Sequence, residues 1–398
     1  MFYRSLPLAF DRSIWYAAPF AALGFLAVLS TKAQIVNEDA LRKVELPASD
    51  GLISCLVAMP DGHTILIGYT KGAPLRTIDT SGWNVVRTIP AASWPDGPRL
   101  EVSADGRIAH AFAQPRFADG RKDDPRVAHA LIDPASGKTL LDFRAKDAAL
   151  SRDGLTVAQL NDEELRIVQV SDGTVLNTIR VAGATNALAY SPKSDVIAVS
   201  HRTTEALLGT VPSVRNDKKA MKSALKFRQM VSFYSTVNGS LIGTVPEVYD
   251  IVRALAFTPD GTRLLVYNSN DPSAQGSTAV RSVFAMNLMA IPGRVEQVDV
   301  DSRTPLRAGF WSQMNEPFLA VSPSGSSIAL SSSEGRNKRK LLLYDLASAD
   351  TQLMIDLEQK HRCDTGEVEE HDGRLAYTWL ADGRLVLALG NNLGILQP

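Results

Sequence analysis

The chain has 398 residues, of which 45% are apolar and 21% charged, and its formal net charge is −1. A chain of this size can bury a large core, and its 27 glycines and 21 prolines suit many short strands and turns. The near-neutral balance gives no reason to expect nucleic acid or an anionic membrane surface as a general partner. Two cysteines are too few for a framework of disulfides.

The chain begins with a segment typical of protein targeting. Arg4 and Arg12 flank a polar start, and residues 13–31 carry no charge. The apolar stretch is short for a membrane-spanning helix, which needs about 20 apolar residues, but long enough for a signal peptide. We therefore expect residues 1–33 to be a cleaved signal peptide or an uncleaved inner-membrane anchor. Either places the folded part in the periplasm or outside the cell, and a cytosolic protein is the remaining alternative.

Seven times after this segment, an apolar run closes on a tight turn and a second apolar run follows. Asp-Gly between two such runs is the strongest short signal for a β-hairpin. The hairpins recur every ~40–65 residues, which is typical of small sheets arranged radially. The turns are at residues 60–62, 104–106, 152–154, 192–195, 259–261, 323–325 and 381–383.

The third repeat shows the four-stranded unit most clearly. Its expected strands are residues 148–150, 155–158, 165–170 and 174–181. Alternating polarity and β-branched residues favour strands in these segments. The seven expected repeats are residues 51–90, 98–144, 147–181, 185–246, 251–300, 317–358 and 374–398.

The seventh repeat is incomplete, because only three strands are expected in residues 374–398. Residues 40–46 have the same character as the fourth strand of the third repeat. We predict that this N-terminal strand completes the last sheet, which closes a ring and removes an open sheet edge. The predicted fold is therefore all-β, with one domain over residues 34–398.

Two motifs carry a resemblance to a known family. Residues 258–266 are a Thr-Pro-Asp-Gly turn followed by an apolar strand, and residues 343–346 read Leu-Tyr-Asp-Leu. Over residues 40–398 the chain resembles the seven-bladed β-propellers of the WD-repeat and YVTN-like superfamily. It departs from WD repeats in having no Trp-Asp dipeptide at the end of a third strand. The resemblance implies a monomeric propeller of the bacterial exported type that binds proteins, and it identifies no partner.

The tight turns of such a ring lie on one face, and the longer connections lie on the other. Because function on a rigid scaffold usually resides in long loops, we expect the working surface on the loop-rich face. The long connections are residues 114–126, 201–229, 268–281, 301–315, 332–339 and 359–372.

The connection in the fourth repeat is the most distinctive. Residues 217–230 carry apolar side chains at helical spacing, which predicts a short amphipathic helix. The helix is either a basic docking element for an acidic protein partner, or it packs its apolar side and solvates its lysines. The candidate partner-binding residues are Lys218, Lys219, Lys222, Lys226 and Arg228.

The alternative to a non-catalytic protein-binding scaffold is a small-ligand binder or a lactonase-like hydrolase. Its site would lie at the mouth of the central channel, where polar residues begin the innermost strands. The candidate residues are Glu101, Asn186, Arg253 and Glu316. The sequence contains no nucleophile elbow, phosphate-binding loop or haem-attachment motif, so an enzymatic activity stays open and is not favoured.

No metal or cofactor is expected. His361, Cys363 and the carboxylates that follow match no recurrent zinc spacing. Residues 129–140 are similar to a repeat of pyrroloquinoline-quinone propellers, but the docking tryptophan of those repeats is missing. Cys55 lies in an apolar strand and is expected to be buried, with a bridge to Cys363 as the alternative. The other histidines, expected at the surface or in packing, are His63, His110, His129 and His201.

Overall fold

The computed structural model describes most of the chain from Ala33 onward. The described residues are 33–90, 94, 97–113, 126–183, 185–193, 195–269, 281–291, 294–308, 319–334, 338–348, 350–357 and 375–397. They belong to one compact unit. No helix in this part of the chain is long and apolar enough to cross a membrane. The expected leader lies outside the described residues, apart from Ala33.

The strands of this unit form seven sheets. Sheet 1 consists of β3 (Ile53–Ala58), β4 (Thr64–Tyr69), β5 (Leu75–Asp79) and β6 (Val85–Ile89). Sheet 2 consists of β7 (Arg99–Val102), β8 (Ala109–Phe112), β9 (Val127–Ile132) and β10 (Thr139–Ala145). Sheet 3 consists of β11 (Asp147–Leu150), β12 (Thr156–Asn161), β13 (Glu164–Gln169) and β14 (Val175–Arg180). Sheet 4 consists of β15 (Thr185–Tyr190), β16 (Val196–Arg202), β17 (Gln229–Ser235) and β18 (Leu241–Thr244).

The remaining three sheets follow in chain order. Sheet 5 consists of β19 (Ile251–Phe257), β20 (Arg263–Ser269), β21 (Arg281–Ile291) and β22 (Arg294–Ala308). Sheet 6 consists of β23 (Leu319–Val321), β24 (Ser327–Glu334), β25 (Lys338–Asp345) and β26 (Thr351–Leu357), with β1 (Gln34–Asn37) added. Sheet 7 consists of β27 (Tyr377–Trp379), β28 (Leu385–Leu389) and β29 (Asn392–Leu396), with β2 (Arg42–Val44) added. The predicted all-β class is confirmed.

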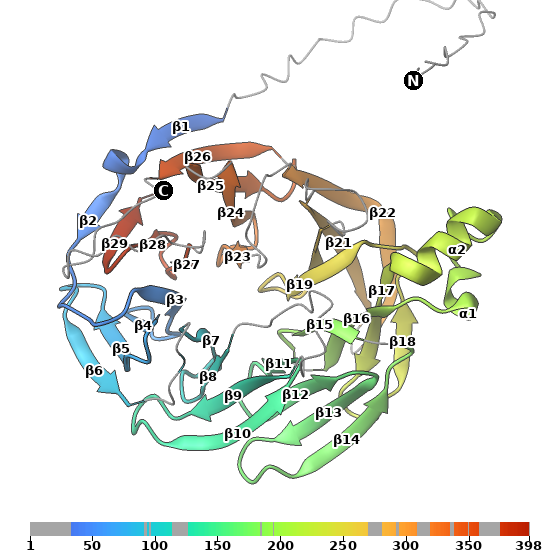
Figure 1. Cartoon of the computed structure of the whole chain (residues 1–398), viewed down its shortest axis with the longest axis horizontal. Coiled ribbons are helices and arrows are strands. Elements are labelled where there is room, and N and C mark those ends of the chain that lie inside the picture. Colours follow the sequence, from blue (N-terminus) through green and yellow to red (C-terminus); the bar gives the residue numbers. More distant parts are fainter. Residues whose placement is uncertain are drawn as a thin grey trace, which may run out of the picture. The chain divides into compact units, whose positions relative to one another are not determined.

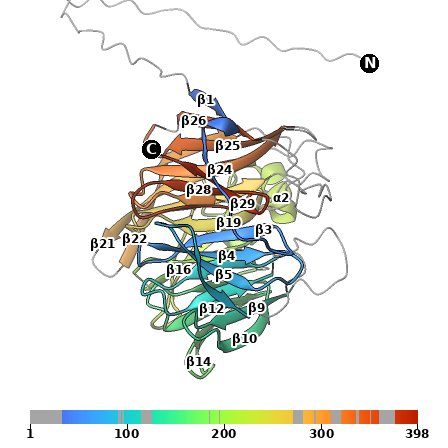
Figure 2. The ribbon, with the colours of Figure 1, turned by 90° about the vertical axis from the view of Figure 1, so that its left-hand side faces the viewer.

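The sheets follow one another around a centre, and the first strand of each sheet is the innermost (Figure 1). Figure 2 shows the same ribbon from the side, with helix α2 (Lys218–Phe227) on the right and the hairpin β21–β22 extending to the left. The insertion that contains α2 therefore lies on the face opposite that hairpin turn.

The burial of each strand explains its sequence pattern. In β16 every residue except Arg202 is buried, because both faces of this middle strand are covered by neighbouring sheets. In the outermost strand β14, Val175 and Leu176 are exposed while Ile179 is buried. Continuous apolar runs therefore mark the middle strands, and mixed runs mark the rim.

Buried apolar clusters join each sheet to the next. Seven such clusters each draw residues from two consecutive sheets, and one of them joins sheet 7 to sheet 1. In that cluster Ile65 and Ile67 of β4 pack with Val386 and Ile395 of sheet 7. Burying one such side chain contributes about 1.5–3 kcal/mol, so these interfaces supply most of the stabilisation.

The first turns of sheets 2, 3 and 5 share one hydrogen-bond pattern. In sheet 3, Ser151 Oγ donates to Asp153 Oδ1 at 2.6 Å and accepts from the Thr156 backbone N–H at 3.0 Å. Gly154 completes this turn with a φ of 73°, and a Cβ there would lie 3.0 Å from Ser103 Cβ in sheet 2. The Ser/Thr-x-Asp-Gly signature therefore satisfies the turn and lets adjacent sheets approach closely.

Two N-terminal strands cover sheet edges. β2 pairs antiparallel with β29, with Val44 opposite Leu393. β1 pairs parallel with β26, with Gln34 opposite Leu353, and this fifth strand of sheet 6 was not expected from the sequence. Both additions satisfy backbone groups that an open edge would leave exposed.

Two of the expected long connections are largely strand. Residues 301–308 belong to β22 and pair with β21, so sheet 5 extends beyond the predicted end at residue 300. Residues 332–334 pair with 338–340 as a continuation of β24 and β25. The polar character of these segments suggested loops, but strands pair through backbone hydrogen bonds, which do not depend on apolar side chains. Of the other expected connections, residues 114–125, 270–280 and 359–372 lie outside the described part of the chain.

Candidate functional site

The insertion between β16 and β17 is a compact helical module. It contains α1 (Glu205–Leu208) and α2. Thr204 caps α1, and Asp217 Oδ1 caps α2 by accepting from the backbone N–H groups of Lys219 at 2.8 Å and Ala220 at 3.0 Å. The predicted helix of residues 217–230 ends at Phe227, because Gln229 and Met230 begin β17. The short helix α1 was not predicted.

The module has an apolar core of its own and is tied to sheet 4. The core consists of Leu208, Val211, Val214, Ala224 and Met230. Arg202 Nη1 donates to the Lys226 carbonyl at 2.8 Å, and Thr203 Oγ1 donates to the Ala224 carbonyl at 3.1 Å. These contacts hold α2 in a fixed orientation on the loop-rich face.

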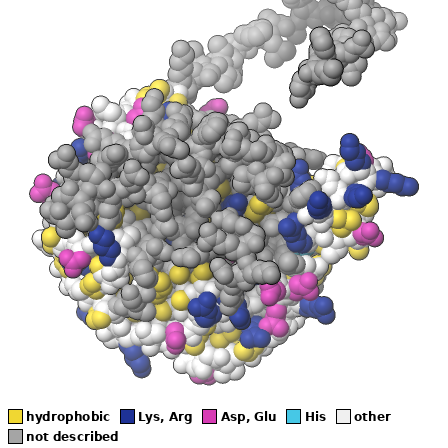
Figure 3. Space-filling model, viewed as in Figure 1, with side chains coloured by type: hydrophobic (Ala, Val, Ile, Leu, Met, Phe, Trp, Pro, Cys, Tyr) yellow, Lys and Arg dark blue, Asp and Glu magenta, His cyan; other side chains and the backbone are white. Residues whose placement is uncertain are grey.

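The basic residues of the module differ in their surroundings. Lys218, Lys219, Lys222 and Lys226 are exposed. Arg228 is half-buried and forms an ion pair with Asp250, at the start of sheet 5. Figure 3 shows dark blue side chains gathered on the module at the right-hand edge of the molecule. Arg228 therefore anchors the module, and the four lysines form the accessible part of the predicted basic surface.

The positive charges of helix α2 lower the stability of the helix. Lys218 and Lys219 occupy the first turn, where the helix dipole disfavours positive charge. Lys218, Lys222 and Lys226 follow at intervals of four residues, an arrangement in which like charges repel by about 0.2–0.5 kcal/mol per pair. No acidic residue lies within the helix to offset them. The helix is held by its capping aspartate and apolar side.

The four channel-mouth candidates do not converge on one point. Among the described residues, only Glu101 lines the pocket found at the channel. The Asn186 side-chain amide donates to the Val252 carbonyl, so it joins sheets 4 and 5. Arg253 lies half-buried on β19 and is not among the pocket-lining residues. Glu316 lies outside the described residues, as do His361, Cys363 and the carboxylates near them.

Glu101 begins a buried polar chain that crosses sheet 2. Its Oε2 atom lies 3.2 Å from His110 Nδ1, and His110 Nε2 lies 3.0 Å from His129 Nδ1. His129 Nε2 lies 3.4 Å from the Ala145 carbonyl oxygen. Both imidazoles are buried, and they stack with Phe112 and Phe143. These histidines are packing residues, as is buried His201, whereas His63 is exposed.

Two groups, His129 within this row of hydrogen bonds and Asp147 beside it, have strongly shifted pKa values. Burial, followed by the nearness of His110, lowers the pKa of His129 well below its ordinary value. Burial raises the pKa of Asp147 to about 7, and the Glu101 charge adds to this rise. The Asp147 carboxylate accepts the Ala148 and Leu188 backbone N–H groups, each at 3.0 Å, and so links sheets 3 and 4.

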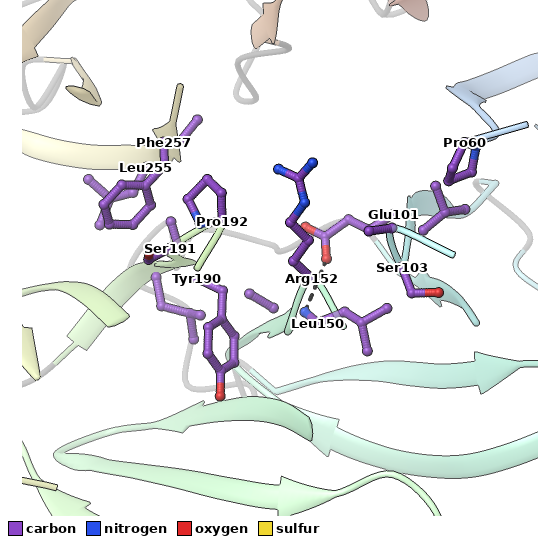
Figure 4. Close-up of a pocket in the computed structure, with 16 residues that line it drawn as sticks. Pro60, Glu101, Ser103, Leu150, Arg152, Tyr190, Ser191, Pro192, Leu255 and Phe257 are labelled. Atoms are coloured by element: carbon purple, nitrogen blue, oxygen red, sulfur yellow. Dashed lines mark hydrogen bonds between the residues drawn. The ribbon is translucent and has the colours of Figure 1, made fainter. Parts of the chain in front are cut away.

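A pocket of about 470 Å³ opens where the innermost strands end at the tight-turn face. Sheets 4 and 5 contribute an apolar wall that includes Leu188, Leu255 and Phe257. Sheets 2 and 3 contribute Glu101 and Arg152 (Figure 4). Among the described residues, no three His, Cys, Asp or Glu side chains are placed to hold a metal ion.

Sequence reasoning named Glu101 but missed the other residues of this pocket, because it looked mainly for function on the opposite face. The sequence analysis also did not predict that His110 and His129 lie side by side. The signal was present in the hairpin register: the tight turn at residues 104–107 places His110 directly opposite Glu101. His129 lies on β9 and could not be placed in this way. The connection from β8 to β9 is long, so the sequence does not give the register of that pair of strands.

Comparison with known proteins finds no matching family model and no matching curated protein. Solved structures do match. The crystal structure of the Cps50 (Swd1) β-propeller domain of Myceliophteria thermophila has a TM-score of 0.59 and 16% sequence identity, covering 90% of this chain and 99% of that chain. The protein is a β-propeller. The Kuenenia stuttgartiensis hydrazine synthase matches with a TM-score of 0.54 and 14% identity, covering 88% of this chain and 97% of that chain.

At these identities the likeness shows the fold of the propeller and nothing of its activity. The WD-like fold predicted from the turn motifs is confirmed at that level. Cys55 is buried in the propeller, with 1% of its surface exposed, and burial raises the pKa of its thiol to about 11. This environment suits the expected role of a small packing residue.

Proposed function

We propose that this propeller is a non-catalytic, exported scaffold that binds an acidic protein partner through helix α2. In this proposal the ring has seven blades, is closed by β2 and acts as a monomer. The seven sheets, the pairing of β2 with β29 and the cluster between sheets 7 and 1 support this closure.

The observation that carries the proposal is the charge of the α2 module. Residues 202–228 contain seven basic and two acidic side chains, in a chain whose net charge is −1. The lysines are exposed on a helix that has fixed anchors, so their positions are set before a partner arrives. The lysines of α2 repel one another and so weaken their own helix. Binding to an acidic partner explains their presence better than exposure to water alone.

A matched pair of double variants tests the docking surface. The wild-type protein is used for native pull-down, and the recovered partner is then purified for binding kinetics. Lys218→Glu/Lys222→Glu should weaken binding roughly tenfold, chiefly through slower association, and binding should weaken as salt rises. Lys138→Glu/Lys193→Glu makes the same charge change at exposed positions outside the module and should bind as wild type. Equal binding by both variants would refute the docking role of α2.

The export part of the proposal rests on the uncharged segment of residues 13–31 and has a separate test. N-terminal sequencing of the mature protein should begin near Gln34 if the leader is cleaved. An intact N-terminus in the membrane fraction would indicate inner-membrane attachment. An intact N-terminus in the cytosolic fraction would contradict export.

The hydrolase alternative has less support. Of its four candidate residues, Glu101 alone among the described ones lines the pocket. A small-ligand role for that pocket does not need the other three, and it is independent of docking through α2.

A further inference from the structure

The pocket at the tight-turn face combines an accessible acceptor oxygen with an apolar wall. We propose that it binds a small neutral phenol. The phenol O–H group donates to Glu101, and the aromatic body of the ligand lies against the wall of sheets 4 and 5. Three features of the pocket define this ligand: the acceptor, the pair of opposite charges at the opening and the wall.

Glu101 presents a fixed acceptor to the pocket. Its Oε2 atom lies 3.2 Å from His110 Nδ1 and accepts the Leu150 backbone N–H at 3.4 Å. Within the described residues, Oε1 accepts no hydrogen bond, and the side chain is 43% exposed. A ligand O–H can therefore donate to Oε1 without breaking a contact of the protein, and a carboxylate held in this way needs little reorganisation.

The serines of the pocket offer no donor to a ligand. Ser103 and Ser191 both line it, but their hydroxyl groups serve the tight turns. Ser103 Oγ donates to Asp105 Oδ1 at 2.7 Å, and Ser191 Oγ donates to Asp195 Oδ1 at 3.1 Å. Each hydroxyl has a single proton, so neither has one left for an acceptor group. The matching ligand therefore brings a donor of its own, which Glu101 accepts.

The charges at the opening disfavour an ionic ligand of either sign. Figure 4 shows the Arg152 guanidinium group extending into the pocket beside Glu101. Whatever hydrogen bonds the guanidinium group makes, its positive charge repels a second cation, while the Glu101 carboxylate repels an anion. A neutral O–H donor avoids both repulsions, and its bond to a carboxylate is of the strong, charge-assisted kind.

The wall favours an aromatic body. Leu188, Leu255 and Phe257 face the opening, and the Phe257 ring can pack edge-to-face or offset on a ligand ring. The Tyr190 hydroxyl points away from the pocket and lies 2.9 Å from Thr156 Oγ1, so Tyr190 adds apolar surface only. A volume of about 470 Å³ admits a two-ring phenol together with bound water.

Fluorescence titration of the full-length protein with 2-naphthol tests the site, and binding should be saturable. 2-Methoxynaphthalene has the same rings without the O–H donor. It should bind roughly tenfold or more weakly, because Glu101 then loses water and gains no hydrogen bond. 2-Naphthylmethylamine and 2-naphthoate carry a positive and a negative charge at neutral pH. Each should also bind roughly tenfold or more weakly, because each meets a like charge at the opening.

Variants assign the acceptor and the wall. Glu101→Gln should reduce the preference for 2-naphthol over its methyl ether, because a neutral amide accepts a weaker hydrogen bond than a carboxylate. Phe257→Leu should weaken the binding of both compounds alike. Glu45→Gln is the matched control, since Glu45 is exposed outside the pocket. Circular dichroism verifies that each variant is folded, and the analogues decide on the wild-type protein alone if Glu101→Gln does not fold.

Three results would overturn the proposal. The first is absence of saturable binding of 2-naphthol. The second is equal affinity for 2-naphthol and its methyl ether. The third is binding of the amine or the carboxylate at least as tight as that of 2-naphthol, which would assign the opening to an ion instead. None of these outcomes depends on whether α2 binds a partner.

Discussion

At the scale of single residues, the buried histidines of sheet 2 couple stability to pH. Because the pKa of His129 is lowered in the folded protein, the unfolded chain takes up this proton at a higher pH. The stability contributed by neutral His129 is therefore present above about pH 6.5 and is lost as pH falls below it. His201, whose pKa burial also lowers, contributes in the same direction.

We expect His129→Phe to flatten this pH dependence. A phenyl ring can join the stack with Phe112 and Phe143, but His110 then loses its partner, which costs about 1–3 kcal/mol at pH 7.5. Urea unfolding from pH 7.5 to 5 should show a lower starting stability and a shallower decline than in wild type. His63→Gln, at an exposed position, is the control. An unchanged slope in the His129 variant would show that this imidazole does not titrate on unfolding.

A second residue-scale prediction concerns the first turn of sheet 3. Gly154→Ala should lower the free energy of unfolding by about 1–2 kcal/mol, because alanine is strained at a φ of 73°. Its Cβ would also press on Ser103 of the adjacent sheet. Gly243→Ala is the control, since nothing lies within 4 Å of a Cβ at that position. Equal destabilisation by both changes would contradict the argument from turn geometry.

At the scale of elements, α2 depends on its cap more than an ordinary helix does. Asp217 places a carboxylate at the lysine-rich N-terminus of α2, whose first turn holds no acidic residue, and it accepts two backbone N–H groups. Asp217→Ala should therefore cost about 1 kcal/mol or more locally. Hydrogen exchange should accelerate in residues 218–227 while the melting temperature of the propeller changes little. Ser223→Ala, an exposed change on the same helix, should leave exchange unchanged, and similar exchange in both variants would refute the role of the cap.

The strands also show which parts of the fold could be predicted from the sequence. The four strands of sheet 3 were predictable because Asp-Gly turns and alternating residues give local signals. The strand character of residues 301–308 was hidden, because this sequence is polar and contains Pro305, a residue that strands seldom hold. β1 was missed for a related reason: its residues pair through the backbone with β26, and Ile35 is 66% exposed. The pocket was not predictable from local pattern, since its wall and its charges come from separate sheets.

At the scale of the whole molecule, we expect the pairing of β2 with β29 to be needed for solubility. Val44 is buried in the cluster between sheets 7 and 1, and β2 satisfies the edge of β29. Deleting residues 33–46 would open the edges of both β29 and β26, whereas deleting residues 33–37 would open β26 alone. An open edge in the middle of a ring interface offers a template for pairing with other chains.

We therefore expect the longer deletion to cause aggregation and the shorter one to leave a soluble protein with a lower melting temperature. Size-exclusion chromatography with light scattering measures the first effect, and thermal unfolding measures the second. The distinction follows from the packing: β2 contributes to a core cluster, while β1 lies mostly exposed along its sheet. A monomeric longer deletion that melts like the parent would mean that the contacts between sheets 7 and 1 hold the ring without β2. The buried clusters alone would then account for closure, and the strand would serve only to cover an edge.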